Sequence, residues 1–384
     1  MTEPDPPRLV VLSGLPGPSG GTVYNTRLAR EWGVTPVPVT GPWPQPGPDD
    51  LTTLRRVLLG GPREQTLVVD GMLASAAPQV VREAVVDGRT VWVLVHLPLP
   101  AETGLAPAQQ CRLEASERAA LAAATGVVVT SEWAATDLRR RYDVNPVVVA
   151  PPGTDPADAA VGSTPARLLT VASFTPRKNH RLLVDALTRV RDLPWTAHWV
   201  GTSGEHDTTG ELRRQLAGAG LGDRVRLEGP RTGQALEAAW AQADLLLLPS
   251  LAETYAMVVG EALVREVPAL VSAGTAAEQT LAGPAAERTL PGPVTEQHPA
   301  GRDTAPGAFG AAPDLAGAAL DPHAPQAWAQ TLFGWLGDQA LRDRWRASAR
   351  RRGAELPRWA DTAAALRRDI GGCHPASAES GTPR

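Results

Sequence analysis

Two acidic residues, Glu253 and Glu261, stand eight positions apart just after an unbroken apolar run from Leu245 to Leu248. Such a run is typical of a strand buried on both faces of a parallel sheet, and Pro249-Ser250 ends it before an apolar-periodic segment that begins at Thr254. Glu253 is therefore predicted at the carboxyl end of a strand, where open α/β sheets bind ligands, with Glu261 about two helical turns further on and on roughly the same face. Acidic pairs at this spacing are common in a chain with 41 acidic residues, so the surrounding elements must decide whether the pair forms a site.

Two cations, Arg177 and Lys178, lie between another predicted strand, 167–173, and a predicted helix. Lys178 is the single lysine among 37 basic residues. A chain that otherwise uses arginine suggests a need for a compact, flexible ammonium here, although a solvated surface position stays open. The positive end of the helix would add to the two charges and predicts a diphosphate site. Carboxylates beside it can accept hydrogen bonds from ribose and hexose hydroxyls, so together the two pairs indicate a nucleotide-sugar.

Strands and helices alternate along both halves of the chain, which predicts an α/β protein with doubly wound parallel sheets covered by helices on both faces. Strand patterns occur at 8–13, 34–40, 66–70, 90–96, 127–130 and 146–150, and again at 167–173, 197–201, 225–228, 245–248 and 269–273. The proline-rich stretch 151–165 between the two series is the best linker. We therefore expect two Rossmann-like domains, at 1–160 and 161–356.

The end of the chain is expected to be less regular. The Gly/Pro-rich segment 284–313 is predicted to be a mobile insertion, and 371–384 a disordered tail. A helix at 357–370 is expected to pack back on the first domain.

Gly20, Gly21 and His96 are the candidate site residues of the first half. The two glycines follow the first predicted strand but do not fit the G-x-G-x-x-G pattern, so nicotinamide binding is not expected. They would let the backbone approach a phosphate or polar substrate closely at a helix start, or else form a plain tight turn. His96 comes at a strand end and faces the same ligand edge, either as a catalytic residue or as a structural hydrogen-bonding group.

The chain resembles family-4 retaining glycosyltransferases of the GT-B fold, in which two Rossmann-like domains face each other across a central cleft. The resemblance extends from Gly20-Gly21 to about Trp359. Its strongest piece is the E-x7-E pattern from Glu253 to Glu261, and its second is the stretch from Val171 to Asn179. It implies that the second domain binds the nucleotide-sugar donor and the first domain the acceptor.

The resemblance also implies an activity, namely transfer of a hexosyl group with retention from a UDP- or GDP-sugar to an acceptor hydroxyl. Neither a metal nor another cofactor is expected, since no D-x-D motif occurs. Arg177, Lys178 and Glu253 would be the catalytic residues, the two cations neutralising the departing diphosphate and Glu253 holding hydroxyls of the transferred sugar. Glu261 would hold the ribose, and His96 would lie by the donor sugar. The implied donor site comprises Gly20, Gly21, His96, Ser173, Arg177, Lys178, Gly201, Glu253, Thr254, Tyr255, Ala256, Met257, Val258 and Glu261.

Two departures from the family pattern fall near the expected sugar pocket. Thr254 and Ala256 stand where glycines usually flank the aromatic residue, and Ala273-Gly274-Thr275 replaces a common Gly-Gly. Added side chains should narrow the space around the sugar.

Two other functions are alternatives to a glycosyltransferase. One is a catalytically silent GT-B-like subunit that binds a sugar nucleotide or a partner, and the other is a pyridoxal-dependent phosphorylase with Lys178 as the Schiff base.

Composition limits the other partners. The net charge of -4 argues against a general nucleic-acid or anionic-membrane binder, and the two cysteines, Cys111 and Cys373, have no metal-ligand spacing. No apolar run reaches the roughly 18 residues that a membrane span needs, and the first residues lack a basic region, so a cytoplasmic protein is expected. The acceptor could be a small molecule, a glycan or a lipid-linked compound. Six arginines between Arg342 and Arg352 leave peripheral membrane contact open beside a solvated helix face with Trp345 packed inward.

Overall fold

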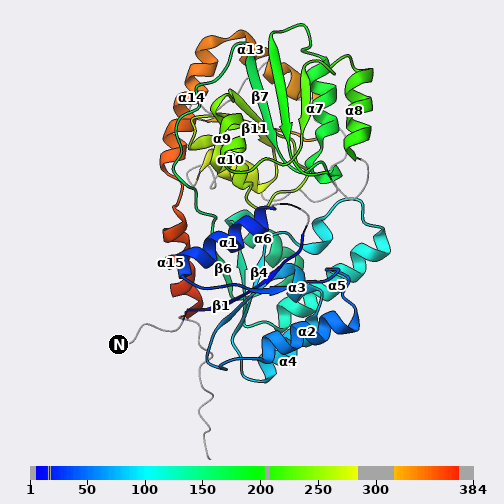
Figure 1. The fold of residues 1–384 in the computed structure, drawn as a ribbon, viewed down its shortest axis with the longest axis vertical. Helices are drawn as coiled ribbons and strands as arrows, with labels where there is room; N and C mark the ends of the chain where they lie inside the picture. The colour runs from blue at the N-terminus through cyan, green and yellow to red at the C-terminus, as the bar shows by residue number, and fades with distance from the viewer. Residues whose placement is uncertain (1–5, 16, 18, 204–207, 284–314, 372–384) are drawn as a thin grey trace, which may run out of the picture.

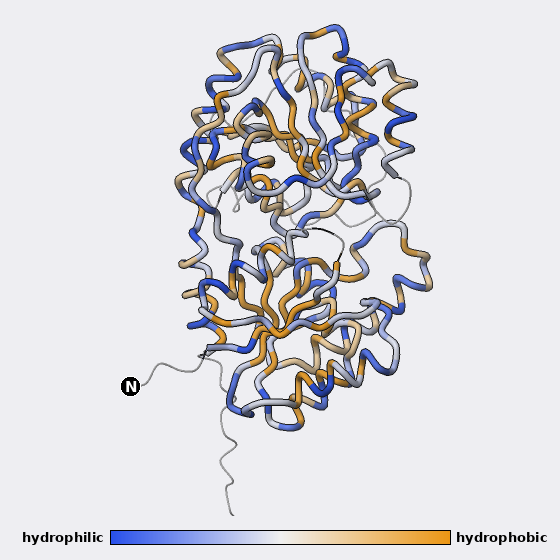
Figure 2. The backbone as a smooth tube through the Cα atoms, viewed as in Figure 1, coloured by the Kyte–Doolittle hydropathy of each residue, from blue (hydrophilic) through white to orange (hydrophobic). Residues whose placement is uncertain are grey.

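The computed structural model describes residues 6–15, 17, 19–203, 208–283 and 315–371. The segment 284–313, expected to be mobile, lies outside these ranges, as does the expected tail 371–384 apart from Gly371. The described residues form two α/β domains, the first in the lower and the second in the upper half of Figure 1. Apolar strands run through the middle of each domain, and the hydrophilic residues gather on the surrounding helices and loops (Figure 2).

The first domain contains a six-stranded sheet of order β2-β1-β3-β4-β5-β6, with every neighbouring pair parallel. Its strands are β1 (Arg8–Leu12), β2 (Val37–Val39), β3 (Leu67–Asp70), β4 (Val91–Val95), β5 (Gly126–Val129) and β6 (Val147–Val149). All residues of β3, β4 and β5 are buried, as expected for strands covered on both faces. The strand order reverses between β1 and β3, which makes their carboxyl ends the expected ligand edge.

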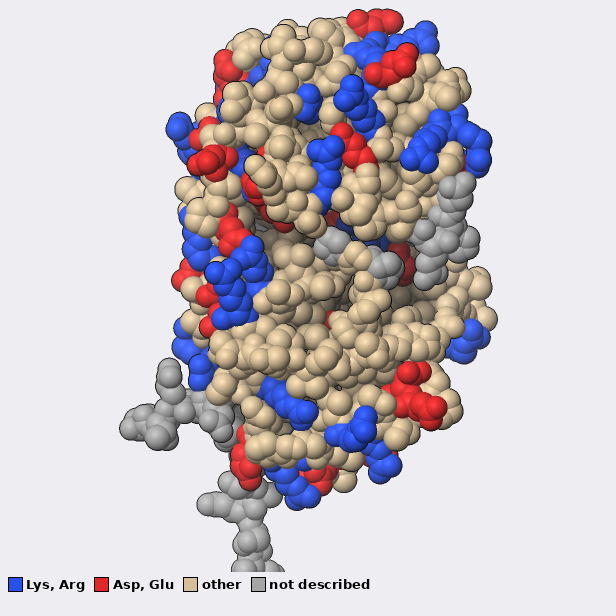
Figure 3. All heavy atoms as spheres, in the orientation of Figure 1, with Lys and Arg blue, Asp and Glu red and all other residues tan. Residues whose placement is uncertain are grey.

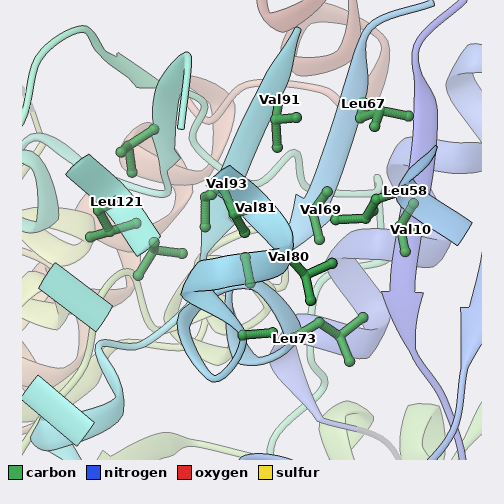
Figure 4. Packing of buried hydrophobic residues seen from close by; sticks show 14 of the residues in the cluster. Val10, Leu58, Leu67, Val69, Leu73, Val80, Val81, Val91, Val93 and Leu121 are labelled. Atoms are coloured by element: carbon green, nitrogen blue, oxygen red, sulfur yellow. The ribbon is translucent and has the colours of Figure 1, made fainter. Parts of the chain in front are cut away.

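Helices cover both faces of this first sheet. They are α1 (Gly20–Trp32), α2 (Pro48–Leu59), α3 (Gly71–Ser75), α4 (Pro78–Val86), α5 (Pro107–Ala123) and α6 (Glu132–Tyr142), with a 3-10 turn, η1 (Leu99–Ala101). Figure 4 shows the core on one face, where Leu58 of α2 and Val80 and Val81 of α4 pack against strand residues such as Val69 and Val93.

The second domain repeats the plan with a parallel sheet of order β12-β11-β10-β7-β8-β9. Its strands are β7 (Ala166–Val171), β8 (Trp195–Val200), β9 (Val225–Glu228), β10 (Leu245–Leu248), β11 (Ala269–Ser272) and β12 (Gly317–Leu320). Its helices are η2 (Pro176–Lys178), α7 (His180–Thr188), α8 (Thr208–Gly218), α9 (Gly233–Ala241), α10 (Met257–Leu263), α11 (Ala276–Ala282), α13 (Pro325–Gly337) and α14 (Gln339–Ala354). The strand order reverses between β10 and β7. The sequence did not predict β12, because Gly-Ala-Ala-Leu carries hardly any strand signal.

The last helix, α15 (Trp359–Gly371), returns to the first domain and lies along α1 (Figure 1). Trp32 Nε1 donates a hydrogen bond of 2.9 Å to the Ala363 carbonyl, and Trp359 packs edge-on against Tyr24. The linker passes so close that a Cβ on Gly153 would lie 2.2 Å from the Trp359 nitrogen. The two domains are therefore joined by two crossings of the chain. No helix in the described ranges is both long and apolar enough to cross a membrane.

Helix α1 begins at Gly20, where Ser19 caps it by accepting a hydrogen bond of 3.1 Å from the Thr22 amide. Another helix start differs from the sequence prediction. Helix α10 begins at Met257 rather than Thr254, because Ala256 has a left-handed φ of 64° that interrupts the helix. Glu253 consequently lies in the loop before α10, so the expectation that Glu253 and Glu261 share one helix face was wrong.

Candidate functional site

A cleft of about 570 Å³ separates the two domains at the carboxyl ends of both sheets. Figure 3 shows the hollow between the two halves of the molecule. Its size falls within the range of roughly 300–1,000 Å³ that is usual for small-molecule and cofactor sites. All fourteen residues of the donor site implied by the sequence line this cleft: Gly20, Gly21, His96, Ser173, Arg177, Lys178, Gly201, Glu253, Thr254, Tyr255, Ala256, Met257, Val258 and Glu261.

Lys178 and Glu253 form an ion pair in the second-domain wall of the cleft. They follow β7 and β10, which are adjacent strands at the point where the strand order reverses. Both side chains are largely buried, at 15% and 10% exposed. Burial alone would raise the pKa of the Glu253 carboxyl, but the charges of Lys178 and Arg177 outweigh it and hold that pKa below its usual value. Glu253 is therefore a buried carboxylate neutralised by cations.

Arg177 reaches across the cleft to the first domain. Its Nε lies 3.1 Å from both carboxylate oxygens of Glu102, which follows η1, and one terminal nitrogen donates to the Ala252 carbonyl at 3.2 Å. The Leu251 amide in turn donates to the Arg177 carbonyl at 2.8 Å. These bonds fasten η2 to the loop that carries Glu253, so the two cations and the carboxylate form one connected unit.

Thr254 connects the two walls of the cleft. Its hydroxyl donates to the carbonyl oxygen of His96, and its own carbonyl accepts hydrogen bonds from Thr130 Oγ1 at 3.1 Å and Ser131 Oγ at 2.7 Å. A glycine at this position would keep the last two bonds and lose the first. The side chain that departs from the family pattern therefore adds a direct bond between the domains.

Glu261 lies on α10, lines the cleft and is partly buried. Burial raises its pKa, Arg265 opposes the rise, and the nearby carboxylates Glu237 and Asp155 add to it. The Glu261 carboxylate makes no hydrogen bond or ion pair with any residue in the described part of the chain. It is therefore open to accept hydrogen bonds from a bound molecule.

His96 and Gly21 face each other on the first-domain wall. His96 Nε2 lies 3.0 Å from Asn25 Oδ1 and 3.9 Å from Asp70 Oδ2. Burial lowers the pKa of His96, and the charge of Asp70 opposes this only in part. A Cβ on Gly21 would lie 2.9 Å from His96 Cδ2, so the glycine is needed for the helix to pack on this ring. Among the described residues, none outside its own helix backbone and its chain neighbours lies within 4 Å of a Cβ placed on Gly20.

The remaining residues of the implied donor site line the cleft in supporting positions. Gly201 follows β8, and a Cβ there would lie 1.9 Å from the Ala172 carbonyl, next to Ser173. Tyr255 is buried, which raises its pKa to about 12. Ala256 caps α10, and Met257 and Val258 form its first turn.

Sequence reasoning missed several cleft residues. Asp70 ends β3 just as Glu253 follows β10, so the strand-end argument that found Glu253 could have found it too. Glu102 and Arg231 lie in irregular segments that carry no comparable signal. No three His, Cys, Asp or Glu residues gather as possible metal ligands in the described ranges.

The arginines of α14 mostly have structural partners. Arg350 pairs with Glu266 at 3.1 Å, Arg342 donates to the Leu336 carbonyl at 2.6 Å, and Arg352 donates to the Thr280 carbonyl at 3.1 Å. Trp345 of the same helix is buried in the core of the second domain. The inward position of Trp345 agrees with the sequence prediction, and these contacts hold several of the arginines against the protein itself.

Comparisons with known proteins find similarity to glycosyltransferases. Residues 165–289 match the model described as glycosyl transferases group 1. A curated relative, D-inositol 3-phosphate glycosyltransferase from Xylanimonas cellulosilytica, is 25% identical over 283 residues, which cover 68% of this chain and 60% of the relative. The match therefore spans less than two thirds of that relative's length.

Solved structures share the fold. Alr3699/HepE from Anabaena, in complex with UDP and glucose, gives a TM-score of 0.67 at 15% identity over 95% of this chain and 100% of that one. Sucrose-phosphate synthase from Thermosynechococcus elongatus gives 0.64 at 19% identity over 85% of this chain and 79% of that one. The GT-B fold and the resemblance to glycosyltransferases that the sequence indicated are thereby confirmed.

Proposed function

We propose that this chain, whose residues 165–289 match the group 1 glycosyltransferases, transfers a hexosyl group from a nucleotide-diphosphate sugar to an acceptor hydroxyl with retention of configuration. The donor is a UDP- or GDP-sugar. In this proposal Arg177 and Lys178 bind the diphosphate, Glu253 holds hydroxyls of the transferred sugar, and Glu261 holds the ribose. The acceptor enters from the side of the first domain.

The observation that carries the proposal is the meeting of Arg177, Lys178 and Glu253 at the switch point of the second sheet. A diphosphate needs fixed positive charge, and sugar hydroxyls need acceptors, so a site for both must place cations next to a carboxylate. A carboxylate whose pKa is held low stays ionised as the donor enters and can keep accepting hydrogen bonds. Lys178 then exchanges part of its pairing with Glu253 for the diphosphate.

The reaction itself requires stabilisation of the leaving group. The bond between the anomeric carbon and the diphosphate oxygen breaks, and its electron pair goes to the diphosphate. The acceptor oxygen bonds to the anomeric carbon from the same face, and its proton passes to a diphosphate oxygen, so no protein base is assigned. Arg177 and Lys178 supply the positive charge that a metal ion would otherwise supply, and metal independence is part of the proposal.

A silent binding subunit is the alternative that one observation favours. In the structure both cations already have carboxylate partners, Glu102 for Arg177 and Glu253 for Lys178, so a donor has to displace existing ion pairs.

A thermal-shift panel of nucleoside diphosphates and nucleotide-sugars tests donor binding. A ligand at 100 times its Kd should stabilise the protein by about 2.7 kcal/mol. Lys178→Ala should abolish most of the shift. Arg181→Ala is the matched control, because Arg181 is an exposed cation in the next helix that pairs with Glu211 at 3.8 Å. No shift with any nucleotide would overturn the proposal.

Activity is tested separately with the nucleotide-sugar that gives the shift. Slow hydrolysis of that donor without acceptor, lost in Lys178→Ala, supports an enzyme. Binding without any hydrolysis or transfer would support the silent subunit instead.

A further inference from the structure

A chain of three polar side chains, Asn25, Asp70 and His96, runs through the first domain and ends at the cleft. Asn25 lies on α1, Asp70 ends β3 and His96 follows β4, so the chain spans a helix and two strand ends next to the switch point. Asn25 Nδ2 donates to Asp70 Oδ2 at 2.9 Å, and His96 Nε2 lies 3.0 Å from Asn25 Oδ1. Asn25 and Asp70 are buried, at 5% and 8% exposed.

Asp70 determines the direction of the hydrogen bonds that link Asn25, Asp70 and His96. A carboxylate only accepts, and its other oxygen already accepts the Met72 amide at 2.9 Å. Asn25 must therefore turn its amide nitrogen toward Asp70 and its oxygen toward His96. An amide oxygen also only accepts, so the hydrogen of this last bond must be on Nε2 of His96.

The other ring nitrogen of His96 is left as an acceptor. Burial lowers the pKa of His96 and favours the neutral ring, and a neutral imidazole carries a single N–H. With that hydrogen on Nε2, Nδ1 presents a lone pair. Nδ1 hydrogen-bonds to none of the described residues, and the ring lines the cleft with 19% of the side chain exposed. Tyr24, whose ring centre lies 5.3 Å away, packs edge-on against the imidazole and fixes its plane.

We infer that Asn25 and Asp70 are positioning residues that hold His96 as the Nε2–H tautomer, so that its Nδ1 accepts a hydrogen bond from a ligand hydroxyl in the cleft. A phosphate or carboxylate at this position would meet a lone pair instead of a proton. The charged side chains that the first domain contributes to the cleft among its described residues, Asp70 and Glu102, are both acidic, so they also disfavour an anionic group. That the hydroxyl belongs to the transferred sugar rests on the proposed function, whereas the tautomer does not.

Nitrogen-15 NMR of the full chain, labelled in histidine and free of substrate, measures the tautomer directly, and His96→Gln assigns the signal. His198 is an internal reference, because its Nδ1 lies 2.8 Å from Glu228 Oε1 and must carry the hydrogen there. We expect opposite neutral tautomers for His96 and His198 in one spectrum. An imidazolium or an Nδ1–H tautomer at His96 near neutral pH would overturn the inference.

Two variants test the role of Asn25. Asn25→Leu removes the acceptor, so His96 should become a mixture of tautomers. Asp70→Asn keeps the shape of that side chain but can donate as well as accept, so the Asn25 amide loses its fixed orientation and His96 should again become a mixture of tautomers. If Asn25→Leu does not fold, Asp70→Asn carries the test alone. An unchanged His96 signal in the folded variants would show that Asn25 does not set the tautomer.

The hydroxyl is tested with the nucleotide-sugar that stabilises the protein. That compound should move the Nδ1 resonance toward its hydrogen-bonded position, and the corresponding nucleoside diphosphate without sugar should not. An unmoved Nδ1 resonance with bound donor would overturn the acceptor role. If no nucleotide binds while His96 has the expected tautomer, the proposed function fails and the positioning role of Asn25 and Asp70 stands.

Discussion

Thr254 and His96 belong to different domains, and the Thr254 hydroxyl donates a hydrogen bond to the His96 carbonyl oxygen. The two residues follow β10 and β4, so the bond joins the ligand-binding edges of the two sheets. It adds to the bonds from Thr130 and Ser131 to the Thr254 carbonyl. The loop before α10 therefore both carries Glu253 and fixes the distance between the cleft walls.

Thr254→Val should loosen this connection, because valine has the shape of threonine without the hydroxyl. The loss of one hydrogen bond should cost about 0.5–1.5 kcal/mol. In thermal unfolding, the melting temperature should fall by roughly 2–4 °C for each kcal/mol of stability lost in domains of this size. Thr254→Ser keeps the hydroxyl and is the control. Equal melting temperatures for the two variants would show that the bond contributes nothing to stability.

Glu253→Gln and Glu261→Gln should affect different kinetic parameters. Glu253 lies beside Arg177 and Lys178, the two cations proposed to bind the diphosphate, so Glu253→Gln should mainly lower kcat. Glu261→Gln should mainly raise the KM for the donor. Steady-state kinetics at saturating acceptor measure both. A lost charge-assisted hydrogen bond corresponds to about 1.5–3 kcal/mol, or roughly 10- to 100-fold. Parallel changes of both parameters in the two variants would refute this division.

Glu102→Gln should tighten binding of the nucleoside diphosphate. The substitution frees Arg177 from its partner across the cleft, so the diphosphate no longer competes with a carboxylate. Glu102 is 43% exposed, which limits the effect to about 0.2–1 kcal/mol, or up to roughly fivefold in Kd. Glu114→Gln, which breaks a similar surface pair with Arg118, is the control for isothermal titration. Weaker binding in Glu102→Gln would contradict the prediction.

Glu261 should make stability depend on pH. Its pKa is raised in the folded protein, so the unfolded chain gives up this proton at lower pH than the folded one. The stability that Glu261 contributes through its raised pKa is fully present below the ordinary glutamate pKa of about 4.3. It is lost as pH rises through the raised pKa. The melting temperature of Glu261→Gln relative to the natural protein should therefore increase across this window. A difference that stays constant with pH would show that the carboxyl is not destabilised by burial.

Local sequence patterns were enough to predict the two α/β domains and the charged residues at the strand ends. Each strand of the second sheet except β12 has an apolar or alternating pattern of its own, and Arg177, Lys178 and Glu253 lie in the loops that follow β7 and β10. The short Gly-Ala-Ala-Leu strand has no such pattern, so nothing in the sequence distinguished it from a loop. The sequence pattern predicted the start of helix α10 too early, at Thr254. The left-handed backbone at Ala256, which keeps the helix from starting before Met257, leaves no mark in that pattern.

The sequence alone thus determined which side chains stand at the ends of strands, because the alternation of strand and helix is encoded in neighbouring residues. Only the tertiary structure decided which of those ends meet. Lys178 reaches Glu253 because β7 and β10 are adjacent at the reversal of strand order. Glu102 reaches Arg177, and Thr254 reaches His96, because the two domains close on each other. Sheet order and domain placement arise from packing between segments far apart in the chain, and no local pattern records them.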